Sequence, residues 1–353
     1  MKILIAVDST KGGAGNIAQI MALYFKEHGY DTHLLFTMGM SNTKHDITGL
    51  NTYCLSEHYK GIIKQISGVK KIIKEINPDI IISFLHTVSP IVLASQWFTK
   101  TPIIVSERSN PYTNVKTKKY RLFRKITYRR ANLVTVQFDV FKEFDKRLFK
   151  KNRIVTVPNM ILSPSVTKEQ RESDIVSFTT MCSLYYVKRV DLMIRLFAQV
   201  NKKMPNTRLN IYGEGIDKDK LTNLIYELGL DNVVTLCGYT TDIYQKFIEN
   251  DIYLMTSERE GFPNSLSEAM AVGLPAVAIK CHDGLKEIIK NGINGYLIDE
   301  GDENAFVEKC CEIANDYNLR KKMSENAISI AKRYDIDNVM NQWIKHINSL
   351  VKQ

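Results

Sequence analysis

The stretch DIYLMTSEREGFPNSLSEAMAVGLPAVA, residues 251–278, decides the fold of this protein. It begins as an apolar strand, turns through a loop at residues 261–264, continues as a helix-like run and ends in a second apolar strand. The pattern predicts Glu260 at the end of the first strand and Glu268 in the first turn of the helix. A strand, a helix and a following strand in this order are typical of a parallel sheet covered by helices.

The start of that helix suits a ligand that carries both hydroxyl and phosphate groups. Backbone N–H groups at a helix N-terminus favour phosphate, and glycine allows a ligand to approach the backbone. Carboxylates on either side would accept hydrogen bonds from hydroxyl groups, as a nucleotide-sugar with its donor sugar, diphosphate and ribose requires. The alternative is a capping box in which Ser265 and Glu268 cap their own helix. That alternative explains Glu268 but not Glu260.

Apolar strands alternate with helix-like runs along the whole chain, from KILIAV at residues 2–7 onward. The alternation pauses at residues 158–173, a polar segment with two prolines that predicts a domain boundary. We expect two doubly wound, Rossmann-like α/β domains facing across a cleft. They span residues 1–165 and 166–335 and are followed by a helix over 336–353. Such sheets bind ligands at the carboxyl ends of their strands.

The composition is that of an ordinary folded protein, with 24% charged and 44% hydrophobic residues in 353. This length favours two domains over one. No run approaches the roughly 18 apolar residues of a membrane-spanning helix, and the apolar N-terminal run is too short for a signal peptide. We therefore expect a cytoplasmic protein. The six cysteines show no CxxC spacing, so we expect reduced thiols and no zinc site.

The net charge of +10 is concentrated in one segment. Residues 116–153 contain fourteen lysines and arginines but only three acidic residues, so the rest of the chain is nearly neutral. Such a surface suits nucleic acid, anionic lipid or phosphorylated substrates.

The motifs together resemble the retaining glycosyltransferases of family 4, which have the GT-B fold. The E-x7-E motif of that family matches Glu260 and Glu268 with their flanks. The runs NIYGEGIDKDKL (210–221) and CHDGLKEIIKNGINGYLI (281–298) also match. The resemblance covers residues 178–298 well and the N-terminal domain more loosely.

The resemblance implies that the N-terminal domain (1–165) binds the acceptor, that the C-terminal domain (166–335) binds the nucleotide-sugar, and that the helix over 336–353 returns to the N-terminal domain. It also implies which residues hold the donor. Glu268 would bind the ribose hydroxyls, Glu260 would face the donor sugar, and Lys188 would neutralise the diphosphate and stabilise the leaving group. Arg189 is the candidate to replace a second diphosphate-binding arginine of the family, because that position is Ser183 here. The remaining donor-binding candidates are Gly213, Gly261, Phe262, Pro263, Asn264, Ser265 and Leu266.

The N-terminal domain contributes further candidates. The resemblance implies that Gly13, in the glycine-rich turn TKGGAGN (10–16), lies beside the donor phosphate and acceptor. His86 follows a buried strand and is expected to act catalytically with Glu260 and Lys188. Glu107 and Arg108 follow another strand, where they either contact the acceptor or pair with each other.

The basic run KTKKYRLFRKITYRR, residues 116–130, interleaves cations with aromatic and aliphatic residues. This pattern suits a helix lying on an anionic membrane surface. The alternative is a solvated helix with an apolar stripe facing the core. A nucleic-acid-binding role is disfavoured, because no recognition-helix or RNA-binding signature accompanies the charge.

We therefore expect a retaining glycosyltransferase peripheral to the inner face of the plasma membrane. It would transfer a sugar from a nucleoside-diphosphate sugar, by family frequency a UDP-sugar, to a hydroxyl of a lipid-linked or polysaccharide acceptor in bacterial cell-surface glycan synthesis. No metal and no cofactor beyond the donor substrate are expected, since no DxD-like metal motif is evident in a convincing loop. The alternative within the GT-B fold is a UDP-sugar 2-epimerase. The sequence does not identify the donor sugar, the linkage or the oligomeric state.

Overall fold

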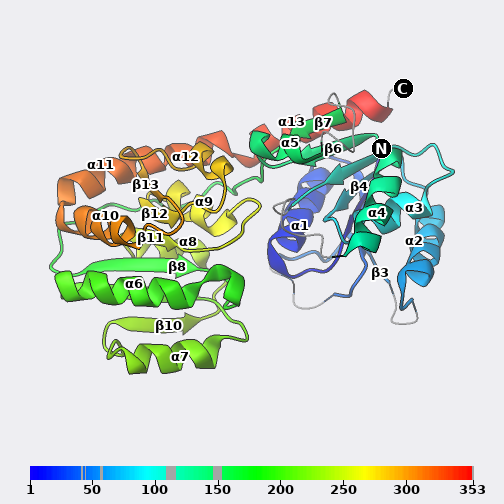
Figure 1. The fold of residues 1–353 in the computed structure, drawn as a ribbon. Coiled ribbons are helices and arrows are strands. Elements are labelled where there is room, and N and C mark those ends of the chain that lie inside the picture. The colour runs from blue at the N-terminus through cyan, green and yellow to red at the C-terminus, as the bar shows by residue number, and fades with distance from the viewer. Residues whose placement is uncertain (41–42, 44, 56–58, 109–116, 146–152, 352–353) are drawn as a thin grey trace. The chain divides into compact units, whose positions relative to one another are not determined.

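The computed structural model describes residues 1–40, 43, 45–55, 59–108, 117–145 and 153–351. The chain divides into two compact units (Figure 1). Unit 1 consists of residues Met1–Met160 and Asp337–Gln353, and unit 2 of residues Ile161–Ile336. The sequence had placed the boundaries at residues 165 and 335. Each unit is an α/β layer structure built on one parallel sheet, as expected.

Unit 1 contains a seven-stranded sheet in the order β3-β2-β1-β4-β5-β6-β7, with every neighbouring pair parallel. The strands are β1 (Lys2–Val7), β2 (Asp31–Phe36), β3 (Asn51–Cys54), β4 (Ile80–Phe84), β5 (Ile103–Ser106), β6 (Leu133–Val136) and β7 (Ile154–Thr156). The central strands are buried on both faces, which explains their continuous apolar sequences. The strand order reverses between β1 and β4, so the loops after these two strands flank the position where such sheets bind ligands.

The helices of unit 1 include the C-terminal helix of the chain. They are α1 (Gly12–Glu27), α2 (Ile62–Ile76), α3 (Ser89–Ser95), α4 (Lys118–Thr127), α5 (Lys142–Asp145) and α13 (Ile336–Val351), with short 3-10 helices η1 (Tyr128–Arg130) and η2 (Asp139–Phe141). Helix α13 buries Val339, Met340, Trp343 and Ile347. At its start, the Tyr24 hydroxyl donates to Asp337 Oδ1 at 2.9 Å. The last helix therefore completes the core formed by the first 160 residues.

Unit 2 contains a six-stranded parallel sheet in the order β10-β9-β8-β11-β12-β13. The strands are β8 (Val176–Met181), β9 (Thr207–Tyr212), β10 (Val234–Gly238), β11 (Ile252–Met255), β12 (Ala276–Ile279) and β13 (Gly295–Ile298). The helices are α6 (Val190–Lys203), α7 (Lys218–Glu227), α8 (Ile243–Ile248), α9 (Asn264–Ala271), α10 (Glu303–Asn315), α11 (Tyr317–Ala327) and α12 (Ser329–Arg333), with η4 (Tyr186–Lys188) and η5 (Asp283–Glu287). The strand order reverses between β8 and β11, so the loops that follow these strands meet at the carboxyl edge.

No helix in the described part of the chain is long and apolar enough to cross a membrane.

Candidate active site

Lys188 and Glu260 meet at the carboxyl edge of the unit 2 sheet. Lys188 ends η4 in the loop after β8, and Glu260 lies in the loop after β11. Lys188 Nζ donates to Glu260 Oε1 at 2.6 Å, and the two side chains are 22% and 13% exposed. Burial lowers the pKa of Lys188, but the charge of Glu260 and its hydrogen bond outweigh that effect and raise the pKa above its ordinary value. The lysine is therefore a fixed cation at neutral pH.

Backbone contacts hold the two loops together. Thr256 Oγ1 donates to the carbonyl oxygens of Lys188 at 3.2 Å and Arg189 at 2.9 Å. The Glu258 N–H donates to the Val187 carbonyl at 2.9 Å. Arg189 has the left-handed φ of 50°, which is uncommon for a residue with a side chain and allows η4 to turn directly into α6. Sequence reasoning did not identify Thr256, although it ends a strand next to the motif.

Two thiols and a histidine surround the ion pair. Cys182 follows β8, and Cys281 and His282 follow β12, so all three lie at the same edge of the sheet. Burial raises the pKa of Cys182 to about 11 and that of Cys281 to about 12, so both are neutral thiols. Burial lowers the pKa of His282 to about 4, against the opposite effects of Glu260 and a hydrogen bond with the Gly261 backbone. Their position directly after apolar strands was the signal that could have identified them.

The loop at residues 261–264 leads into α9 without a side-chain cap. Pro263 is the N-cap residue, and its side chain accepts no hydrogen bond. The Ser265 hydroxyl instead lies 2.8 Å from the Tyr253 hydroxyl, inside the helix rather than at its cap. The capping-box alternative is therefore wrong for Ser265. Phe262 is 5% exposed and packs edge-on against Tyr334 with 5.1 Å between ring centroids, which anchors the loop.

The other residues of the motif lie on the first turns of α9. Leu266 is fully buried beneath the loop, while Asn264 and Glu268 are half-buried. The charge of Glu268 contributes to the raised pKa of the Tyr244 hydroxyl, after the larger effect of burial. Glu268 and Glu260 therefore lie at opposite ends of one loop–helix unit, as the sequence motif predicts.

Gly213 allows the end of β9 to approach the loop after β8. Its φ is 139°, and a Cβ atom there would lie 1.8 Å from the Cys182 carbonyl oxygen. The Gly213 N–H donates to the Gly238 carbonyl at 2.8 Å. Gly213 therefore shapes the loop that leads to Lys188, and its contact with a donor stays a prediction.

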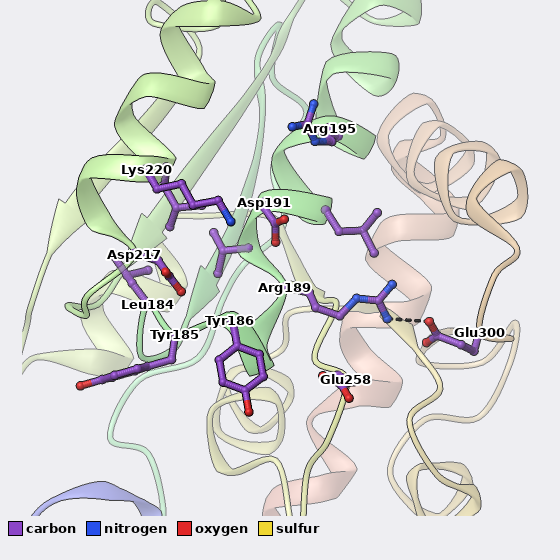
Figure 2. Close-up of a pocket in the computed structure, with 13 residues that line it drawn as sticks. Leu184, Tyr185, Tyr186, Arg189, Asp191, Arg195, Asp217, Lys220, Glu258 and Glu300 are labelled. Atoms are coloured by element: carbon purple, nitrogen blue, oxygen red, sulfur yellow. Dashed lines mark hydrogen bonds and ion pairs between the residues drawn. The ribbon is translucent and has the colours of Figure 1, made fainter.

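Arg189 forms an ion pair with Glu300 in unit 2. Its Nη1 lies 2.6 Å from Glu300 Oε1, and it lines a pocket of about 590 Å³ together with Tyr185, Tyr186 and Glu258 (Figure 2). The structure thus brings Lys188 to Glu260 and Arg189 to Glu300.

In unit 1, the glycine-rich turn and His86 lie at the carboxyl ends of β1 and β4. Gly13 is exposed in the first turn of α1. The glycine at which α1 closely approaches the backbone of the preceding loop is Gly15, where a Cβ atom would lie 2.4 Å from the Ser9 carbonyl oxygen. Burial raises the pKa of Asp8, and hydrogen bonds with the backbone of Ser9 and of Asp8 itself, followed by the charge of His86, offset part of that effect. The roles of Gly13 and His86 stay predictions.

Glu107 and Arg108 do not pair with each other, so that alternative is wrong. Glu107 accepts from Arg124 Nη2 at 2.9 Å and from the Tyr128 hydroxyl, and the side chains of the ion pair are 2% and 3% exposed. Arg108 is 8% exposed, donates to Asn159 Oδ1 and lies over the Phe84 ring. Burial lowers the pKa of Arg108 to about 9. A role at the acceptor stays a prediction for both residues.

The basic run forms α4 and η1 from Lys118 to Arg130. Lys116 and residues 146–152 of the wider basic stretch lie outside the described residues. Tyr128 is fully buried, and Tyr120 and Phe123 are half-buried, so the aromatic residues face inward.

Comparison with known proteins identifies the class of enzyme. The model of the family "Glycosyl transferases group 1" matches residues 167–330. The model of "Glycosyltransferase Family 4" matches residues 11–161. The two matches do not overlap, and together they cover most of the chain. The chain therefore belongs to the group 1, family 4 glycosyltransferases, and the protein is a glycosyltransferase.

Individual relatives agree with this assignment over most of their length. A glycosyltransferase of Methanocaldococcus jannaschii is 27% identical over 80% of this chain and 82% of its own. An alpha-1,4-N-acetyl-D-galactosaminyltransferase of Campylobacter jejuni, named for an acceptor that ends in PP-undecaprenol, is 25% identical over 85% of this chain and 84% of its own. The structure of Anabaena HepE in complex with UDP and glucose matches with a TM-score of 0.84 and 19% identity, covering 99% of this chain and 100% of that chain. The structural likeness shows the fold.

Proposed function

We propose that this enzyme transfers a sugar, with retention of configuration, from a UDP-sugar to a hydroxyl of a lipid-linked glycan. The observation that carries the proposal is the Lys188–Glu260 pair at 2.6 Å, beside the uncapped N-terminus of α9. The site combines a fixed cation, a partly accessible carboxylate and a helix N-terminus whose N-cap side chain accepts no hydrogen bond. These three features together suit a diphosphate joined to a sugar.

Lys188 would stabilise the departing diphosphate. A phosphate oxygen can replace Glu260 as the partner of the ammonium group, because the pair is only partly buried. Negative charge grows on the leaving group as the glycosidic bond breaks, and a preorganised cation stabilises that charge more in the transition state than in the ground state. Glu260, released from Lys188, would accept hydrogen bonds from the donor sugar, and Glu268 from the ribose. His86 is proposed as a further catalytic group.

This arrangement also supports a reaction that needs no metal ion. Lys188 and the positive end of α9 supply the charge that a divalent cation would otherwise bring to the diphosphate. Among the described residues, no group of three or more His, Cys, Asp or Glu side chains is placed to hold a metal ion. We expect activity to persist in excess EDTA.

The acceptor and the location are proposed from the relatives and the charge. The Campylobacter relative is named for a PP-undecaprenol-linked glycan, and HepE was solved with UDP and glucose. A lipid-linked acceptor lies in a membrane, and the basic segment of unit 1 would keep the enzyme on the inner face of that membrane.

The test measures nucleoside-diphosphate release from a panel of UDP-, GDP- and ADP-sugars, with and without a membrane extract that contains lipid-linked glycans. Wild-type enzyme should release UDP from one donor, faster with the extract, and NMR of the product should show the anomeric configuration of the donor. Glu260→Ala and Lys188→Ala should each lower kcat by about 100-fold or more, as expected for removal of a transition-state charge partner.

Glu258→Ala is the matched control, because Glu258 is a half-exposed carboxylate in the same loop that does not contact Lys188. It should retain activity. Inverted product, or equal losses in Glu258→Ala and Glu260→Ala, would contradict the proposed mechanism. Release of an epimerised sugar without transfer would contradict the proposed reaction.

A further inference from the structure

The loop between β4 and α3 carries His86 and consists of residues 85–88. Its first residue, Leu85, has a φ of 70°. This left-handed conformation is unfavourable for a residue with a side chain, because the Cβ atom crowds the following carbonyl oxygen. It persists only where the surrounding structure holds it, and such positions are concentrated at functional sites. The contacts that hold this loop are therefore candidates for a functional role.

The left-handed residues of the chain support this view. In the described part of the chain, the residues other than glycine with positive φ are Asn77, Leu85 and Arg189. Asn77 is the C-cap residue of α2, a position where a left-handed asparagine is ordinary. Arg189 directly follows Lys188, and Leu85 directly precedes His86. The two strained positions that no helix cap explains thus adjoin two groups proposed for the reaction.

The sheet and the first turn of α3 fix the start of this loop. The Leu85 N–H donates to the Ser106 carbonyl, at the end of the neighbouring strand β5, at 3.0 Å. The Leu85 carbonyl accepts from the N–H groups of Val88 at 3.2 Å and Ser89 at 3.0 Å. These contacts hold Leu85 in its strained conformation.

A tyrosine from α4 fixes the middle of the loop. The Tyr120 hydroxyl donates to the carbonyl oxygens of His86 at 2.7 Å and Thr87 at 3.0 Å. Burial raises the pKa of Tyr120 to about 12, so the hydroxyl keeps its proton and stays a donor at neutral pH. Because the peptide group is planar, a fixed His86 carbonyl restricts the rotation of the backbone at His86. The direction in which the His86 side chain leaves the backbone is then restricted as well.

Helix α4 presents this hydroxyl from a fixed frame. Arg124 Nη2 donates to Glu107 Oε1 at 2.9 Å, and the Tyr128 hydroxyl donates to the same oxygen. Tyr120, Arg124 and Tyr128 are spaced by four residues, so they lie on one side of α4 and its continuation η1. Helices α3 and α4 also contact each other (Figure 1). The position of the Tyr120 hydroxyl is therefore set by β5, the strand that pairs with β4.

We propose that Tyr120 is a positioning residue, whose hydroxyl holds the loop after β4 in the conformation in which His86 takes part in sugar transfer. Tyr120 acts through the backbone, since both atoms that its hydroxyl contacts are carbonyl oxygens of the loop. The inference rests on the proposed function, because His86 is a catalytic group only under that proposal. Precise placement matters, since a shift of about 1 Å in a reacting group can lower a rate by about a hundredfold.

The first test removes the hydroxyl and leaves the ring. Tyr120→Phe should lower kcat for sugar transfer by about ten- to a hundredfold and change the KM for the donor by less than about twofold. Tyr317→Phe is the matched control, because its hydroxyl also donates to a backbone carbonyl, that of Gln170 at 3.3 Å in unit 2. It should keep the kcat of wild type. Equal losses in the two variants would overturn the proposal.

The dependence on His86 separates positioning from a general effect on the fold. If Tyr120 acts through His86, Tyr120→Phe lowers kcat in the wild-type background and has no further effect in the His86→Ala background. The same loss in both backgrounds would overturn the proposal. An unchanged kcat in Tyr120→Phe, or in His86→Ala, would do so as well.

A measurement on His86 itself tests the positioning without substrate. The chain contains seven histidines, so carbon-13 labelling of the histidine rings gives few NMR signals, and His86→Ala identifies the signal of His86. Tyr120→Phe should shift or broaden that signal more than any other, whereas Tyr317→Phe should leave it unchanged. A His86 signal that Tyr120→Phe does not move would overturn the proposal even if kcat falls.

The two measurements together distinguish this inference from the proposed function. Movement of the His86 signal in Tyr120→Phe, with no turnover of any donor by the wild type, overturns only the proposed function. Turnover by the wild type, with an unmoved His86 signal in Tyr120→Phe, overturns only the positioning.

Discussion

Two ion pairs, Lys188–Glu260 and Arg124–Glu107, differ in burial. Burial distinguishes an ion pair that a ligand can open from one that only stabilises the fold. The side chains of the first pair are 22% and 13% exposed, whereas those of the second are 3% and 2% exposed. A partly accessible pair can exchange one partner for a ligand at little cost. A buried pair cannot, because breaking it leaves an uncompensated charge in a medium of low dielectric constant. We therefore propose ligand chemistry for the first pair, whereas the second pair fixes α4.

The buried pair yields a stability prediction. Glu107→Ala should lower the free energy of unfolding by about 3–5 kcal/mol, because Arg124 and the Tyr128 hydroxyl lose their buried acceptor. Adding Arg124→Met should recover part of this loss, since the unpaired charge is then gone. Glu75→Ala, at an exposed acid on α2 of the same unit, is the control and should change stability by less than about 0.5 kcal/mol. Urea unfolding measures all four proteins, and a loss below about 1 kcal/mol in Glu107→Ala would contradict the assignment.

At the scale of elements, the candidate site depends on how closely strand ends approach one another. The end of β9 packs against the loop after β8 at Gly213, and that loop turns through η4 to present Lys188. Gly213 contributes by allowing the backbone conformation and the close approach that this loop requires.

Gly213→Ala should therefore disturb both stability and donor binding. The added Cβ would lie 1.8 Å from a backbone oxygen at a φ of 139°, so the loop must move. We expect a loss of at least about 3 kcal/mol and weaker UDP binding by calorimetry. Gly229→Ala is the matched control, because its φ is 66° and nothing lies within 4 Å of the added Cβ. It should cost about 1 kcal/mol, and equal effects of the two substitutions would exclude the steric explanation.

At the scale of the whole molecule, the chain forms two units, and unit 1 contains residues from both ends of the chain. Helix α13 is the last element, yet it completes the core of unit 1. Both tryptophans, Trp97 and Trp343, belong to unit 1. Tryptophan fluorescence therefore reports the unfolding of unit 1, whereas circular dichroism reports both units.

This division predicts the separate effects of two matched substitutions. Ile347 in α13 and Ile194 in α6 are both fully buried. Ile347→Ala should lower the fluorescence-detected stability by about 2–5 kcal/mol through the cavity it leaves. Ile194→Ala should lower stability by a similar amount in circular dichroism while the fluorescence transition stays near that of wild type. A fluorescence transition unchanged by Ile347→Ala would show that α13 does not stabilise unit 1.

The sequence by itself determined the alternation of strands and helices, the two-domain α/β architecture and the loop–helix unit that carries Glu260 and Glu268. These features are local. Apolar runs mark buried strands, and a strand followed by a helix places its connecting loop at the carboxyl edge of a parallel sheet. The family resemblance added Lys188, which sequence spacing alone does not connect to Glu260.

Only the tertiary structure decided which groups meet. Lys188 and Glu260 are 72 residues apart, and they pair because β8 and β11 are neighbours in the sheet. Glu107 pairs with Arg124, 17 residues away, rather than with adjacent Arg108. Successive side chains at the end of a strand point to opposite faces, so Glu107 reaches α4 while Arg108 reaches α1 and α13. Sequence patterns record local geometry, whereas charge pairing depends on strand order and on the face each side chain takes.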